Sequence, residues 1–239
     1  MQVFYTDDIQ NQKAFFEGQE AHHIVKVLRH QQGDVLNWVD GLGYRYRGEI
    51  VEITKRRVTA RVIERIEVKT SRKGTIHLVI APTKNMTRME WLIEKLCEIG
   101  IDQISFVICQ NSERRSINMD KVKKKIISAS KQSKKARFPR VNTPLDFREF
   151  IDLTHEEASI PRYIAHCRDR LEPLVKRIEF GKGGMVMIGP EGDFTKEEIQ
   201  YAESHGWMAV GLGVERLRTE TAALVACQNF HTIHQLHTE

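Results

Sequence analysis

The stretch Met185-Val186-Met187-Ile188-Gly189-Pro190-Glu191-Gly192 runs from an apolar segment directly into a loop that contains glycine and proline. Thr195 and Glu198 follow at the spacing of a capping box, which predicts a helix just after the loop. A second stretch repeats the arrangement, because the apolar segment 207–212 leads through Gly213 to a helical pattern that begins near Thr219. Both stretches therefore predict strand–loop–helix units, the building blocks of α/β domains.

The same alternation continues back to residue 75. One helix is predicted by an apolar stripe at helical spacing, with Thr87 and Glu90 as a capping box and Gly100 at its end. Further strands are predicted at residues 75–81, 103–109 and 162–166, and further helices at 119–133, 171–180 and 219–236. This order predicts an α/β domain with a largely parallel sheet.

The first 70 residues have a different pattern, dominated by short strands and turns. Strands are predicted at residues 34–39, 44–53 and 58–68, and one short helix at 20–30, where Ile24, Val27 and Leu28 share a face. Several strands with one small helix predict a small β-barrel. The polar segment 69–74 ends in glycine, and we expect the domain boundary there.

The positive charge of the chain is concentrated in residues 121–140. The 239-residue chain has 37 Lys and Arg against 32 Asp and Glu, which gives a net charge of +5. Residues 121–140 contain nine Lys or Arg and no acid, so subtracting them from +5 leaves −4 for the rest of the chain. Such a run is either a solvated helix face or a surface for phosphate groups, and its end, Arg137-Phe138-Pro139-Arg140, favours nucleic acid.

Several classes of protein are excluded by composition. A hydrophobic content of 41% with 29% charged residues is typical of an ordinary globular protein. No apolar run reaches the roughly 18 residues of a membrane span, and residues 1–10 lack the apolar core of a secretory signal. The four cysteines lie far apart without metal-ligand spacing, so we expect reduced thiols, no metal and a cytoplasmic location.

The two glycine-containing loops are the candidate ligand site. Both follow predicted strands and precede helices, which is where open α/β sheets bind ligands. Glycine lets the backbone approach a ligand closely, so backbone N–H and C=O groups there suit the edges of an adenine and a ribose. Ordinary loop chemistry is the alternative for either loop alone. The sequence has neither GxxxxGK[ST] nor a GxGxxG after the first α/β strand, which excludes a P-loop and disfavours a dinucleotide fold.

Four segments together resemble a known family, the bacterial 16S ribosomal RNA uridine-N3 methyltransferases of the SPOUT (trefoil-knotted) class. The segments span nearly the whole chain: His22 to Arg29, Lys84 with Glu90 to Gly100, Gln132-Ser133 with Arg137 and Pro139, and the pair formed by Ile188 to Gly192 and Leu217 to Ala222. The resemblance implies a PUA-like β-barrel that binds RNA at residues 1–70. It also implies a knotted catalytic domain at residues 74–239, an exception to the usual unknotted topology.

The resemblance also implies S-adenosylmethionine as cofactor, a homodimer and a set of site residues. The cofactor would contact His166, Cys167, Ile188, Gly189, Pro190, Glu191, Gly192, Gly211, Leu212, Gly213, Leu217 and Thr221. The catalytic candidates are Arg218, Thr219 and Glu220, with Arg218 expected to stabilise negative charge on the uracil oxygens. Alternatively, Arg218 forms a structural ion pair with Glu220 or Glu191, and Thr219 only caps the last helix.

The expected RNA contacts are basic or hydroxyl side chains in both predicted domains. They are Arg29, Lys84, Arg114, Ser116, Lys131, Lys134, Lys135 and Arg137. His22 and His23 are expected to be structural or surface residues, and Arg29 has the alternative of closing the domain interface. The chain departs from the family pattern at Lys131, Lys134 and Lys135, where Glu, Gly and Arg are common, and at Asp193, which replaces a second glycine after Gly192. It also differs at Glu215 and Arg216, where a basic and an aliphatic residue are common.

Two other functions remain open from the sequence. One is methylation of transfer RNA, for example at a ribose 2′-OH, by a SPOUT relative. The other is a non-catalytic RNA-binding factor in ribosome assembly that has kept the fold.

Overall fold

The computed structural model describes residues 2–70, 72–155, 160–168 and 171–237. The chain forms two compact units, one of Met1–Thr70 with Ile126–Phe138 and the other of Ser71–Lys125 with Pro139–Glu239. The helix α3 (Met119–Gln132) therefore contributes residues to both units.

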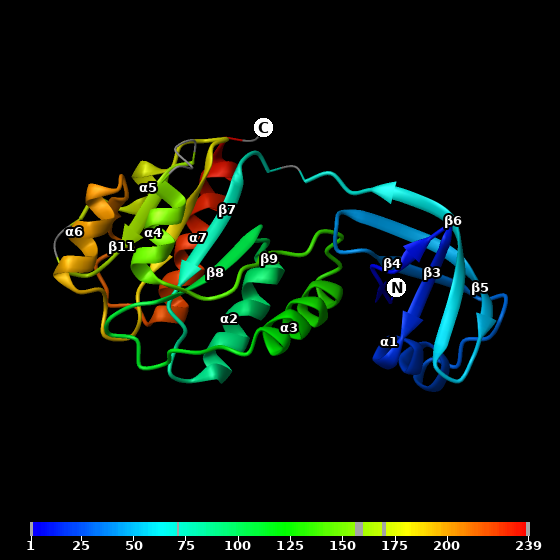
Figure 1. The fold of residues 1–239 in the computed structure, drawn as a ribbon. Helices are drawn as coiled ribbons and strands as arrows, with labels where there is room; N and C mark the ends of the chain where they lie inside the picture. Colours follow the sequence, from blue (N-terminus) through cyan, green and yellow to red (C-terminus); the bar gives the residue numbers. More distant parts are fainter. Residues whose placement is uncertain (1, 71, 156–159, 169–170, 238–239) are drawn as a thin grey trace. The chain divides into compact units, whose positions relative to one another are not determined.

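The first unit is built on a six-stranded sheet that curls around its own core (Figure 1). Its strands in spatial order are β1 (Phe4–Tyr5), β4 (Val35–Val39), β5 (Tyr44–Ile53), β6 (Arg57–Glu67), β3 (Lys13–Glu17) and β2 (Ile9–Gln10). The long strands β5 and β6 change register at Arg47/Gly48 and at Ile50/Glu52, and such bulges bend a sheet. Gly48 lets β5 approach β6 closely at the first of these bulges, because an added Cβ would lie 2.3 Å from the carbonyl oxygen of Arg61.

The strand predictions for this unit are confirmed by β4, β5 and β6, whereas β1, β2 and β3 were not predicted. Two of the missed strands have only two residues, too few to show a period. The third follows a turn in which Asn11 and Gln12 both have positive φ, of 48° and 61°. The core combines aliphatic side chains with aromatic rings, among which Trp38 stacks on Tyr46 at a centroid distance of 5.4 Å.

The predicted helix at residues 20–30 is wrong in its second half. The chain forms a short α-helix, α1 (Gly18–His22), and then a π-helical turn, η1 (His23–Val27), in which the Leu28 N–H donates to the His23 carbonyl at 3.0 Å. The extra residue in the turn rotates the following side chains. Ile24 is buried as expected, but Val27 and Leu28 are 57% and 37% exposed.

The end of α3 and the residues after it pack in the first unit. Gly43 N–H donates to the Ala136 carbonyl at 3.0 Å, and Phe138 N–H donates to the Gly41 carbonyl at 2.8 Å. Lys131 forms an ion pair with Glu20 on α1. The turn between β4 and β5 is thus completed by a segment about 90 residues further along the chain, which the predicted boundary at 69–74 did not anticipate.

The second unit is an α/β fold whose strands are all parallel, which confirms the predicted sheet (Figure 1). The spatial order is β10 (Leu145–Asp146), β8 (Gln103–Ile108), β7 (Thr75–Ile80), β12 (Gly183–Ile188), β11 (Arg162–Ala165) and β13 (Met208–Val210), with β9 (Arg140–Val141) also paired to β8. Strand β12 lies between β7 and β11, so the chain returns to the middle of the sheet after it has passed beyond it.

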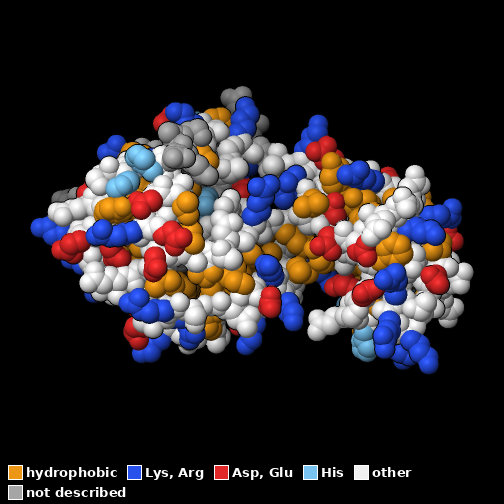
Figure 2. All heavy atoms as spheres, viewed as in Figure 1, with side chains coloured by type: hydrophobic (Ala, Val, Ile, Leu, Met, Phe, Trp, Pro, Cys, Tyr) orange, Lys and Arg blue, Asp and Glu red, His pale blue; other side chains and the backbone are white. Residues whose placement is uncertain are grey.

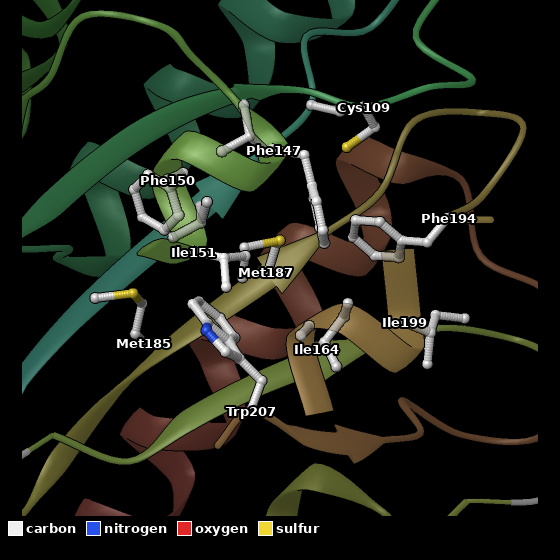
Figure 3. Packing of buried hydrophobic residues seen from close by; sticks show 14 residues of the cluster. Cys109, Phe147, Phe150, Ile151, Ile164, Met185, Met187, Phe194, Ile199 and Trp207 are labelled. Carbon is white, nitrogen blue, oxygen red and sulfur yellow. The ribbon is translucent and has the colours of Figure 1, made fainter. Parts of the chain in front are cut away.

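Helices cover both faces of this sheet. They are α2 (Met86–Ile99), α4 (Phe147–His155), α5 (Leu174–Arg177), α6 (Lys196–Ser204) and α7 (Thr219–Leu236). The first part of α3 lies beside α2, where Lys125 pairs with Glu94. Met185, Met187 and Ile164 point to the side of α4 and α6, and Figure 3 shows Met187 among the rings of Phe147, Phe150 and Trp207. On the other side, the ring of Phe230 on α7 packs against Tyr163 of β11.

The helix predictions are confirmed for α2, α3, α6 and α7, and the capping box of Thr195 and Glu198 is present. The predicted helix at 171–180 is only the single turn α5, because residues before Leu174 pair with Gly211 and Ile178 is already extended. The predicted capping box of Thr87 and Glu90 is wrong, since the N-cap is Asn85, whose side chain accepts from the Thr87 N–H at 2.9 Å. Gly100 does end α2, with φ of 98°.

Helix α4 was not predicted, although its buried residues Phe147, Phe150, Ile151 and Thr154 have helical spacing. In the described part of the chain, no helix is long and apolar enough to cross a bilayer.

Candidate cofactor and RNA site

Three neighbouring strands of the second unit end at one edge of the sheet. Strands β12, β11 and β13 are adjacent and parallel, so the segments after them, residues 189–195, 166–168 and 211–218, leave the sheet on the same side. This edge is where ligands bind in open α/β sheets. The structure therefore brings together the two glycine-containing loops and the pair His166 and Cys167.

The loop after β12 is held in shape by hydrogen bonds to neighbouring segments of the chain. The Lys84 N–H donates to Glu191 Oε1 at 3.0 Å, and Asn111 Nδ2 donates to the carbonyls of Gly192 and Asp193 at 3.2 and 3.0 Å. Gly189 lies so close to the Phe194 ring that an added Cβ would be 3.1 Å from it. Asn111 was not predicted as a site residue, because a single asparagine after a strand carries no distinctive sequence signal.

In the loop after β13, some backbone groups are hydrogen-bonded within the protein and others are not. The Gly211 N–H donates to the Glu172 carbonyl at 3.0 Å, and the Gly211 carbonyl accepts from the Leu174 N–H at 2.9 Å. By contrast, Leu212 and Gly213 make no hydrogen bond with any residue that the structure describes. A Cβ added to Gly213 would also meet nothing within 4 Å. Leu212 and Gly213, rather than Gly211, thus offer backbone groups that suit the polar edges of a nucleoside.

The segment after β11 contributes one buried and one exposed residue. His166 is buried, its N–H donates to the Val210 carbonyl at 3.4 Å, and its Nδ1 accepts from the Arg168 N–H at 3.3 Å. Cys167 is exposed beside it. Ile188 and Pro190 are buried, whereas Leu217 and Thr221 are partly exposed.

The catalytic candidates lie at the start of α7. Arg218 is exposed and occupies the N-cap position of α7. Thr219, which the sequence allowed as the cap, is instead the first residue of the helix. The Arg218 side chain forms no ion pair or hydrogen bond with the residues described, whereas Glu220 is buried 3.7 Å from Arg88 Nε. Glu191 accepts from the Lys84 backbone instead. The structural ion pair considered for Arg218 is therefore absent, and its charge adds to the positive end of the helix dipole.

The expected RNA contacts divide into free and engaged side chains. Arg114 donates through its guanidinium to the carbonyls of Thr83 and Lys84, at 2.8 to 3.2 Å, and so shapes a loop. Lys84 Nζ lies 2.7 Å from Glu113, and this hydrogen bond raises the pKa of the Lys84 ammonium. Ser116 is exposed. Figure 2 shows charged side chains of both signs scattered over the visible face, among hydrophobic and uncharged ones.

The candidates in the first unit are similarly mixed. Lys131 is largely buried in its pair with Glu20, whereas Lys134 and Arg137 are exposed and Lys135 is partly exposed. Arg29 is exposed with a left-handed backbone, φ 59°, just after η1.

Comparison with known proteins identifies the family. Residues 70–231 match the RNA methyltransferase domain, and residues 16–63 match the RNA methyltransferase PUA domain. The chain belongs to this RNA methyltransferase family. The family resemblance and the expected fold, a PUA-like domain followed by a SPOUT methyltransferase domain, are thereby confirmed.

Relatives match along almost the whole chain. The ribosomal RNA small subunit methyltransferase E of Buchnera aphidicola is 27% identical, covering 97% of this chain and 92% of that protein, and the one of Bacillus subtilis is 27% identical, covering 87% and 86%. Among solved structures, a probable rRNA methyltransferase from Porphyromonas gingivalis has 36% identity, a TM-score of 0.90 and full coverage of both chains. The small subunit methyltransferase E of Neisseria gonorrhoeae, bound to S-adenosyl methionine, has 26% identity, a TM-score of 0.82 and 98% coverage of both.

Proposed function

We propose that this protein transfers a methyl group from S-adenosylmethionine to N3 of a uridine in the 16S RNA of the small ribosomal subunit. The observation that carries the proposal is the sheet edge at which Leu212 and Gly213 present backbone that is unbonded to the described residues. Arg218, five residues further on, likewise forms no ion pair with the part of the chain that the structure describes. The names of the relatives, and the S-adenosyl methionine bound to one of them, support the cofactor and the RNA.

The residues at this edge suit the parts of the cofactor. When bound, S-adenosylmethionine supplies a methyl group on a sulfonium, which is already an electrophile. Backbone groups of Ile188, Gly189, Gly192, Leu212, Gly213 and Leu217 would hold it, with His166 and Cys167 on the adenine side. Gly211 would contribute only indirectly, since its N–H and carbonyl are bonded within the protein.

Arg218 would act on the base rather than on the cofactor. Loss of the N3 proton leaves negative charge on the uracil ring and its oxygens, and a cation that is not neutralised by a protein carboxylate stabilises that charge most strongly. Arg218 meets this condition, whereas Arg88 is already beside Glu220. Thr219 and Glu220 begin α7 and would set the direction of the Arg218 side chain.

We assign RNA binding to residues 1–70 and catalysis to residues 74–239, and we place the enzyme in the cytoplasm as a homodimer. Exposed apolar side chains of the second unit, Trp91 on α2 and Val214 before α7, are available to a second copy of the chain. Light scattering of the purified protein measures this state, with twice the mass of 27.7 kDa expected.

The decisive experiment offers the protein two RNA substrates. Purified small subunits that lack the modification and unmodified transfer RNA are each incubated with S-adenosylmethionine, and digested nucleosides are identified by mass spectrometry. We expect 3-methyluridine from the 16S RNA only. Methylated transfer RNA supports the transfer RNA alternative, and cofactor binding absent by calorimetry supports the non-catalytic assembly factor.

A further inference from the structure

Asp193 occupies a backbone conformation that glycine adopts more easily. Its φ is 61°, in the left-handed region, where a side chain costs energy and where Asp and Asn are the best tolerated residues after glycine. A carboxylate at this position therefore needs a reason other than the backbone.

The two carboxylate oxygens of Asp193 bond to two different segments. Oδ1 accepts from the N–H of the next residue, Phe194, at 2.8 Å, which is a local contact. Oδ2 accepts from the N–H of Cys167 at 3.2 Å, which connects the loop after β12 to the segment after β11. A glycine would make neither bond.

Further hydrogen bonds lie next to the bond between Asp193 and Cys167. The Arg168 guanidinium donates through Nε and Nη2 to the Phe194 carbonyl at 3.0 and 2.8 Å, next to the Asp193 bond. From the segment after β8, Asn111 Nδ2 donates to the Asp193 carbonyl at 3.0 Å. The loop that carries Asp193 is thus hydrogen-bonded both to Arg168 and to Asn111.

We propose that Asp193 is a positioning residue that fastens the backbone of Cys167, and with it His166, to the loop at residues 189–193. The two segments then present a fixed edge to the nucleoside part of the cofactor. The inference rests on the proposed function for the identity of that ligand. Asp193 itself does not need to touch the cofactor.

Two substitutions distinguish this positioning role from the alternative that Asp193 is present only because aspartate tolerates the positive φ. Asp193→Gly relaxes the backbone and removes both bonds, whereas Asp193→Asn tolerates the turn but has one acceptor oxygen in place of two. Calorimetry with S-adenosylmethionine should give a Kd that is weakened about tenfold for Asp193→Gly, and by less for Asp193→Asn. In steady-state kinetics, KM for the cofactor should rise while kcat stays near the wild-type value. An Asp193→Gly protein that binds the cofactor as tightly as wild type overturns the proposal.

The control is Gln12→Gly in the first unit. Gln12 has the same φ of 61° and lies far from this loop in sequence, so its replacement by glycine relaxes an equivalent turn. We expect the cofactor Kd of Gln12→Gly to equal that of wild type.

Amide hydrogen exchange tests the bond without any cofactor. By NMR, the Cys167 N–H should exchange more slowly in wild type than in Asp193→Gly, and equal rates also overturn the proposal. If the wild-type protein binds no S-adenosylmethionine but the Cys167 exchange rates differ, the proposed function fails while the connection between the two segments stands.

Discussion

At the scale of single residues, the site separates charges that the sequence places close together. Glu220 and Arg218 are two positions apart, yet Glu220 is buried beside Arg88 of α2 while Arg218 is exposed. Arg218 is the N-cap residue with an extended backbone, whereas Glu220 lies in the first turn of α7, so the two side chains do not share a helix face. Arg218 consequently keeps its charge for a ligand.

Replacement of Arg218 by alanine should impair the reaction and not the binding of the cofactor. We expect kcat to fall about 100-fold or more, as when a group that stabilises developing charge is removed from other enzymes. The cofactor Kd from calorimetry should not change. Arg216→Ala, two positions earlier in the same exposed loop, is the matched control. Wild-type turnover in Arg218→Ala would show that the residue has no catalytic role.

At the scale of elements, strand β7 carries a polar group into the middle of the parallel sheet. His77 is buried, its Nε2 lies 2.8 Å from Ser105 Oγ on β8, and the same hydroxyl accepts from Asn142 Nδ2 at 2.8 Å. Burial lowers the pKa of His77 from 6.5 to about 4, because the charged imidazolium is poorly solvated there. His77 is therefore a neutral residue within the paired strand β7.

Acid should weaken the second unit through His77. Above pH 6.5 the imidazole is neutral in both states, so the effect is absent there. As the pH falls from 6.5 to about 4, the unfolded chain takes up a proton that the folded state excludes, and the free energy of unfolding decreases. The expected loss is about 2 kcal/mol at about pH 5, measured by urea unfolding against a reference at about pH 7.5. His77→Gln should show a smaller loss over this range, and an equal loss in both proteins would contradict the assignment.

At the scale of the whole molecule, fewer of the basic side chains in residues 121–140 are available to RNA than the composition indicates. Of the nine cations in residues 121–140, Lys125 lies 2.5 Å from Glu94 and Lys131 is paired with Glu20. These two lysines pair with carboxylates of the protein, so their charge is not available to the phosphates of RNA. The exposed members, such as Lys134 and Arg137, keep their charge for RNA.

Salt dependence of RNA binding distinguishes the two groups of lysines. Lys134→Gln should reduce the slope of log K against log salt by about one, because one phosphate contact is lost. Lys131→Gln should leave the slope unchanged and lower the melting temperature, since it breaks the pair with Glu20. Filter binding to the small subunit over a range of salt concentrations measures both slopes. Equal slopes in Lys134→Gln and wild type would exclude Lys134 from the interface.

Local features of this protein are determined by its sequence alone. The strands β5, β6 and β12, the capping box of α6 and the glycine at the end of α2 follow from periodicity and capping, which depend on residues within a few positions of each other. The paired motifs at Ile188 to Gly192 and Leu217 to Ala222 were specific enough to indicate the family.

The tertiary structure alone decided which partners these residues have. Gly211 is bonded to Glu172 and Leu174, Lys131 is paired with Glu20, and β12 lies between β7 and β11. Each of these contacts joins segments that are far apart along the chain, and hydrophobic periodicity contains no information on the path between them. The free backbone of Leu212 and the connection from Asp193 to Cys167 exist for the same reason, because the parallel strands end side by side only in the folded sheet.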